Sequence, residues 1–324
     1  MRFQGVYSNC MNDPGKSSRF QKDLELIKYF ENRKTRAQAR LQQKSGQSLY
    51  FALVGFNTEV DSFSINSLAR LEPVVEPPGA VELASATDAC VPFAAVGRWS
   101  SAIKHEIVID RESISDEQKV LNLAWAIISS LRVRTLVPFV VPAYADRSWS
   151  TISAFNDRSV RVRLLEDYPL AKAVGERATV RAEDVQWIRD HFPAFVELNR
   201  IESFKLSVEA LSTYHYAFSL RLMAVSLWAG IDALLGADAE TSFRTALYAA
   251  SLLEPRGASR ESLFDSMRKL YKTRNKAVHG HNVADGELAQ HIVAVRQILS
   301  RILCRIVEIG HVPSKKELDE LALL

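Results

Sequence analysis

The stretch LYKTRNKAVHG, residues 270–280, decides how the C-terminal part of the chain is interpreted. The residues before it continue an apolar helical pattern, and Gly280 is the residue type that ends a helix by taking a left-handed conformation. With 3.6 residues per turn, Asn275 and His279 stand one turn apart on one helix face, and Arg274 needs its long side chain to reach them. The spacing therefore predicts a guanidinium, a carboxamide and an imidazole near one helix end.

These three side chains suit the cleavage of an RNA phosphodiester without a metal ion. An arginine binds phosphate bidentately and stabilises the charge of the transition state, and a histidine transfers protons near neutral pH. The 2′-hydroxyl of RNA is an internal nucleophile, so the protein only has to move protons and stabilise the phosphorane. One histidine cannot flank the phosphate on both sides. A two-fold dimer that pairs two copies of the helix would supply a base and an acid.

The same residues also have a purely structural interpretation. In a chain of this composition, an Arg with a His five residues later is expected roughly 0.6 times by chance, and adding the Asn lowers this to roughly 0.02. Arg274 and Lys276 would favour a helix C-terminus even if no substrate bound there. His281 lies across Gly280 from His279, so we expect it in a loop. Lys276 and His281 are candidate substrate-binding residues.

Three sequence blocks place the motif in a wider context. They are RLMAVSLWAGIDALLG at 221–236, TSFRTALYAASLL at 241–253 and LYKTRNKAVHGHN at 270–282. With them, residues 203–310 resemble a HEPN domain of the Apea-like branch. The resemblance implies an all-α helical bundle and a metal-independent endoribonuclease of a toxin or antiphage-defence type. It further implies a homodimer through the helical domain with a composite active site.

Carried over residue by residue, the resemblance implies that Arg274, Asn275 and His279 are catalytic, with no metal and no cofactor. Asp232 stands where members of the family commonly have a glutamate. Some HEPN domains are catalytically inactive modules that bind RNA, a nucleotide or a protein partner, and this is the alternative function.

Length and composition define the organisation of the chain. Its 324 residues predict an α+β protein, with a mixed α/β domain at 1–195 and a helical domain at 196–324. The net charge of +3 is too small to require a nucleic-acid partner, so any basic surface is local. The three widely spaced cysteines favour a reducing, cytoplasmic compartment over a disulfide framework or a zinc site. No signal peptide is expected, because mixed polar residues and no apolar region follow Arg2. No membrane partner is expected, because Arg221 and Asp232 interrupt the most apolar run.

The first 195 residues show the periodicities of a mixed domain. Strands are predicted at 48–57, 59–65, 71–75, 103–110, 137–143, 148–155 and 159–165, and helices at 20–44 and 116–131. The basic second half of the 20–44 helix is either an RNA-facing strip or, the favoured interpretation, a solvated face. The pairs Arg132/Arg134 and Arg161/Arg163, if in strands, would either bind phosphate or protect a sheet edge.

No chemistry is recognised in this half. By analogy with the resembled family, it would sense an unknown trigger or hold the nuclease in check. After Pro193 the chain is predicted to be helical. One long helix or two consecutive helices are expected at 203–235, further helices at 242–253, 259–279 and 286–309, and a short last one from 314.

Overall fold

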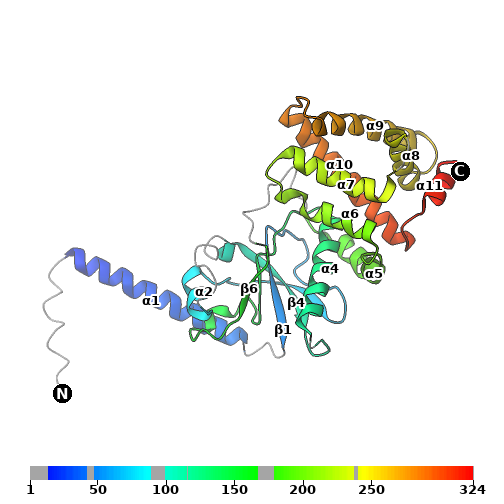
Figure 1. The fold of residues 1–324 in the computed structure, drawn as a ribbon. Coiled ribbons are helices and arrows are strands. Elements are labelled where there is room, and N and C mark those ends of the chain that lie inside the picture. The colour runs from blue at the N-terminus through cyan, green and yellow to red at the C-terminus, as the bar shows by residue number, and fades with distance from the viewer. Residues whose placement is uncertain are drawn as a thin grey trace, which may run out of the picture.

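The structure, a computed structural model, describes residues 14–41, 47–88, 99–114, 116–166, 179–236 and 240–323, with side chains from residue 21 onward. These residues form two parts, a sheet flanked by helices and a bundle of helices (Figure 1). We call them the sheet domain and the helical domain. The arrangement confirms the predicted α+β class.

The sheet domain is built on one antiparallel sheet with the strand order β2-β3-β4-β1-β5-β6. Its strands are β1 (Ser48–Val54), β2 (Phe63–Ser64), β3 (Ala69–Pro73), β4 (Ile103–Asp110), β5 (Ala143–Ala145) and β6 (Val162–Leu164). Its helices are α1 (Pro14–Leu41), α2 (Ala80–Ala86), α4 (Glu117–Thr135) and α5 (Ala182–Leu198), with short turns η1 (Ser100–Ala102) and η2 (Ile152–Ala154). Helices α4 and α5 cover one sheet face, and α2 with η2 covers the other. The central strand β1 is buried along its whole length because both faces are covered.

The strand predictions are met in part. The segment 137–143 is largely buried, but in the described part of the chain it enters the sheet only through a bridge from Val140 to Val54 and at Ala143, where β5 begins. Strand β4 has the predicted bounds.

The strand predicted at 148–155 is wrong, because this segment folds into a turn and η2. The buried Glu106 accepts hydrogen bonds from the Ser148 hydroxyl at 2.6 Å and from the Trp149 N–H at 2.8 Å, and the Thr151 hydroxyl donates to the Ser148 carbonyl at 2.9 Å. These local bonds replace those of a strand.

The prediction that Arg132 and Arg134 could form a phosphate-binding strand face is also wrong. Both residues lie in α4, which runs four residues past the predicted end at 131, and Arg132, Val133 and Thr135 are buried in this extension. Arg132 pairs with Glu166 at 2.8 Å. Arg134, the other arginine of this sequence pair, forms an ion pair with Asp184 at 2.9 Å.

The second arginine pair belongs to a sheet edge. Arg163 lies in β6, the last strand of the sheet, and Arg161 immediately precedes it. Arg161 binds Asp146 at 3.3 Å. The two interpretations of Arg161 and Arg163 were phosphate binding and protection of a sheet edge. Their position at the edge strand agrees with the second.

Helix α1 projects from the sheet domain and contacts it through its basic C-terminal half (Figure 1). Arg33 pairs with Glu82 at 2.8 Å, and Arg36 and Arg40 pair with Glu76 at 2.6 and 2.7 Å. Hydrogen bonds from Arg36 and Arg40 lower the pKa of Glu76 to about 2. At Arg33 and Arg40 the basic half is thus neither an RNA-facing strip nor a solvated face, because these residues dock the helix onto acidic residues, whereas Arg36 is 49% exposed.

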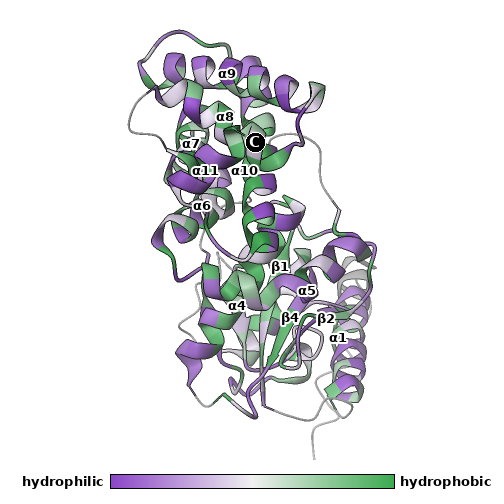
Figure 2. Ribbon diagram, turned by 90° about the vertical axis from the view of Figure 1, so that its right-hand side faces the viewer, coloured by the Kyte–Doolittle hydropathy of each residue, from purple (hydrophilic) through white to green (hydrophobic). Residues whose placement is uncertain are grey.

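Seven elements of the helical domain lie in the part of the chain that the structure describes. They are α6 (Glu202–Thr213), η3 (Tyr214–Tyr216), α7 (Leu220–Leu235), α8 (Thr241–Leu253), α9 (Ala258–Val278), α10 (Asp285–Ile309) and α11 (Lys315–Leu323). The stretch predicted as one or two helices is two, since η3 breaks it and Ser219 caps α7 by accepting from the Leu222 N–H at 3.2 Å. Figure 2 shows that α10, which contacts α4 to α9, is largely hydrophobic, whereas α9 carries many hydrophilic residues.

Helix α5 belongs to both domains. Ile188 and Phe192 pack in the core of the sheet domain, and Phe195 and Leu198 pack in that of the helical domain. The predicted domain boundary falls inside this helix, as does Pro193, after which the helical region was expected to begin. None of the helices within the described ranges combines the length and the apolar character needed to cross a membrane.

Candidate functional site

Helix α9 ends where the motif predicts, and Gly280 ends it. Its φ of +76° is left-handed, and no heavy atom lies within 4 Å of where a Cβ would stand, so glycine is required there by conformation alone. The N–H of His281 donates to the carbonyl of Lys276, and that of His279 to the carbonyl of Asn275, each at 3.0 Å. The first of these bonds is typical of glycine-terminated helices. His279 is consequently the C-cap residue, with its imidazole exposed at the helix end.

Arg221 of α7 holds this helix end from the side. Its Nη1 donates to the carbonyl of Ala277 and its Nη2 to the carbonyl of His281, both at 2.8 Å. These carbonyls precede and follow His279, so one guanidinium fixes the turn that carries the imidazole. A small apolar cluster packs behind the turn and consists of Leu220, Ala277, Val283 and Leu288. The sequence missed Arg221 because its partners are backbone groups of another helix.

Arg274 lies partly buried between α9 and α7. Its Nη1 donates to Oδ1 of Asn275 at 3.1 Å, and its Nη2 lies 3.3 Å from Oδ2 of Asp232. Burial raises the pKa of Asp232, and the charge of Arg274 opposes this rise. Nε of Arg274 and Oδ1 of Asp232 are buried and have no hydrogen-bond partner among the described residues. The ion pair therefore leaves part of its hydrogen-bonding capacity unused.

The predicted site residues are brought together only in part. Arg274 and Asn275 are in contact, and no side-chain hydrogen bond within the described ranges joins either of them to His279. Lys276 and His281 are exposed, and they contribute to the helix end through backbone groups. The ion pair with Arg274 makes Asp232 part of the candidate site, although sequence reasoning assigned no role to this residue. The sequence feature that could have indicated it is a lone acidic residue near the end of an apolar helix.

An aromatic layer supports Arg274 from below. The guanidinium carbon lies 5.3 Å from the ring centroid of Tyr271, whose ring packs edge-on against Trp228 at a centroid distance of 5.2 Å. The Trp228 indole N–H donates to Nε2 of His291 at 2.9 Å. This bond requires Nε2 to be unprotonated, and burial lowers the pKa of His291 to about 4. The layer under the candidate site therefore depends on a neutral histidine.

A pH dependence of stability follows. The unfolded chain protonates His291 near its ordinary pKa of about 6.5, whereas the native chain does so only near 4, so the free energy of unfolding falls as the pH drops through this interval. Each such histidine contributes about 1.4 kcal/mol per pH unit where only the unfolded state binds the proton. His215, whose pKa burial lowers to about 3, acts in the same direction. We expect His291→Gln to make the decline between pH 6.5 and 5 shallower, measured by urea unfolding.

An exposed residue without a titratable side chain provides the control for this experiment. The variant Asn122→Ala should keep the wild-type slope over the same pH interval. Equal slopes for wild type and His291→Gln would contradict the assignment of a neutral, buried His291.

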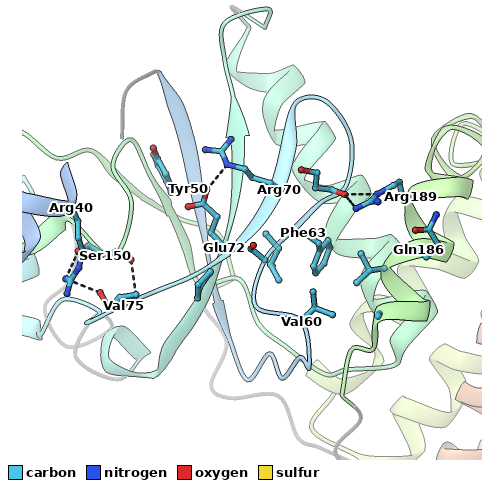
Figure 3. A pocket seen from close by; sticks show the side chains of 16 residues that line it. Arg40, Tyr50, Val60, Phe63, Arg70, Glu72, Val75, Ser150, Gln186 and Arg189 are labelled. Atoms are coloured by element: carbon cyan, nitrogen blue, oxygen red, sulfur yellow. Dashed lines mark hydrogen bonds and ion pairs between the residues drawn. The ribbon is translucent and has the colours of Figure 1, made fainter. Parts of the chain in front are cut away.

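A groove in the sheet domain does not include the motif residues. It has a volume of about 1080 Å³ and follows β3 between α1 and α5. Figure 3 shows that its arginines are already engaged: Arg40 with Val75 and Ser150, Arg70 with Glu72, and Arg189 with the carbonyl of Ser64. A ligand in this groove would have to displace existing bonds.

Among the described residues, no group of three or more His, Cys, Asp or Glu side chains could hold a metal ion.

Comparisons with known proteins do not assign the chain to a family. The chain matches no protein-family model, no curated protein and no solved structure. The resemblance to HEPN domains therefore rests on the three sequence blocks alone.

Proposed function

We propose that this protein is a metal-independent endoribonuclease of the toxin or antiphage-defence type, acting as a cytoplasmic homodimer. The observation that carries the proposal is the geometry at the end of α9, where Arg274 contacts Asn275 and the imidazole of His279 is exposed one turn further on. A cation and a proton-transfer group at an open helix end suit a phosphodiester substrate.

In this proposal Arg274 binds the scissile phosphate and stabilises the phosphorane. Its incomplete pairing with Asp232 supports this role, because the buried Nε has no partner among the described residues. Asp232 and Asn275 hold the guanidinium in place, and His279 transfers protons at the 2′-hydroxyl or at the leaving 5′-oxygen. The products carry a 2′,3′-cyclic phosphate and a 5′-hydroxyl. Lys276 and His281, exposed beside His279, would contact the flanking nucleotides.

The dimer is proposed because each chain supplies one imidazole to a reaction that uses two. An apolar strip offers a surface for a second copy: Phe218, which precedes α7, and Leu222 and Val225 on α7 are 88%, 58% and 39% exposed. Val278 on α9 is a further exposed apolar residue, with 43% of its surface accessible. Burial of the strip across a two-fold axis would bring two copies of α9 together.

The test is cleavage of mixed cellular RNA by the purified chain in the presence of EDTA, with the product ends identified. Cleavage that leaves cyclic-phosphate ends supports the proposal. Intact RNA, together with RNA binding that Arg274→Ala weakens and His279→Ala does not, would instead identify the inactive binding module.

A further prediction concerns Arg221. We expect Arg221→Met to lower kcat for RNA cleavage by about tenfold to a hundredfold with KM nearly unchanged, because the imidazole moves while the phosphate-binding Arg274 stays in place. Arg244, a half-exposed arginine of α8, serves as the control, and Arg244→Met should keep kcat. An Arg221→Met variant with wild-type kcat would show that the two carbonyl contacts do not position His279.

A further inference from the structure

A cleft lies at the junction of the two domains, away from the motif. It has a volume of about 1120 Å³ and is lined by one face of α4, by the end of α5, and by α6 and η3. Figure 1 shows these helices side by side where the domains meet. At its inner end is the buried pair of Arg132, 4% exposed, and Glu166, 8% exposed. Tyr216 of η3 accepts a hydrogen bond from Arg132 at 3.0 Å, so both domains contribute to the floor.

Three buried polar atoms of the lining residues have no hydrogen-bond partner among the described residues. They are Oδ1 of Asn199, Oγ of Ser212 and Nε of Arg132. A buried polar group without a partner costs about 1–3 kcal/mol. Three of them around one cleft point to a bound molecule that completes some of these hydrogen bonds. The groove of Figure 3 lacks this feature, since none of its described lining residues has such an atom.

The other lining residues define the chemistry of that molecule. Trp125 presents a half-buried indole, and small apolar side chains beside it make a surface for a flat ring. Because Oδ1 of Asn199 is a hydrogen-bond acceptor, the ring should carry an N–H donor. Lys205 and Arg200 lie at the exposed rim, where they outnumber Glu209, although Arg200 also pairs with Glu197 at 3.0 Å. An anionic group attached to the ring would lie beside these cations.

We propose that this interdomain cleft binds a nucleoside phosphate. The ring stacks on Trp125, its amino group donates to Asn199, the ribose reaches Ser212, and the phosphate pairs with Lys205. Because the walls come from α4 and α6, the ligand would bridge the sheet domain and the helical domain. The proposal does not depend on RNA cleavage.

The test is calorimetric titration of the full chain with AMP. We expect saturable binding at one site per chain. Lys205→Glu and Trp125→Ala should each weaken it by about tenfold or more, since each removes one of the main contacts. The matched charge reversal Lys28→Glu, on an exposed position of α1, should leave the affinity unchanged. Arg274→Ala should also leave it unchanged, because the cleft is separate from the motif.

Inorganic phosphate and adenosine, titrated separately, should bind at least tenfold more weakly than AMP. Absence of AMP binding at about 1 mM would overturn the proposal. So would AMP binding that Lys205→Glu and Trp125→Ala leave intact, or binding that Arg274→Ala abolishes, since the ligand would then lie elsewhere. A thermal unfolding curve of each variant verifies that the fold is retained.

Discussion

Replacing His279 by alanine is expected to lower RNA cleavage by about a hundredfold to ten-thousandfold, the range for loss of a positioned proton-transfer group. The imidazole is exposed at the C-cap, and it forms no side-chain hydrogen bond with Arg274 or Asn275 within the described ranges. Its removal should therefore leave the free energy of unfolding within about 0.5 kcal/mol of wild type. The measurement is the initial rate of cleavage of a defined RNA, together with urea unfolding.

The exposed His311, which pairs with Glu317 at the start of α11, is the matched control. His311→Ala should cleave RNA at the wild-type rate. Equal rates for wild type and His279→Ala would remove the imidazole from the mechanism.

Mixing experiments examine the composite site directly. If each active site needs an imidazole from both copies, a re-equilibrated equal mixture of wild type and His279→Ala should retain about a quarter of the activity, because only wild-type pairs are complete. Retention of about half would indicate independent sites, one in each chain.

Local sequence rules predicted the end of α9 well. The predicted helix ends at His279, and Gly280 ends it with the expected left-handed conformation. The predicted convergence of three side chains is found for Arg274 and Asn275 only. The helix end and this contact depend on residues close in sequence. The bounds of β4 were also predicted, because its apolar residues 107–109 form a buried run.

Long-range contacts account for what the sequence could not predict. Arg221 holds the turn around His279 only because α7 lies against the end of α9. The basic half of α1 docks on Glu76 and Glu82, which lie 36 to 49 residues away along the chain. A charged residue in a helix gives no sign of its partner in such cases, because the same pattern fits a solvated face.

The buried pair at the domain junction should be the most sensitive structural position. Arg132 forms bonds of 3.0 and 2.8 Å with Glu166, donates to the Phe139 carbonyl at 2.8 Å, and reaches Tyr216 in the helical domain. Glu166 also accepts from the Val141 N–H at 2.6 Å. Arg132→Met would leave the Glu166 carboxylate buried without its counter-ion. We expect a loss of about 3–5 kcal/mol in the free energy of unfolding, measured by urea denaturation.

A second substitution separates the charge effect from simple loss of packing. In Arg132→Met/Glu166→Gln the uncompensated charge is gone, and the amide can still accept from Val141, so the double variant should recover at least half of the loss. The exposed pair of Arg200 and Glu197 is the control, and Arg200→Met should cost less than about 1 kcal/mol. If Arg132→Met cost no more than Arg200→Met, the domain junction would depend on apolar packing alone, and the Arg132 contact with Tyr216 would not couple the two domains.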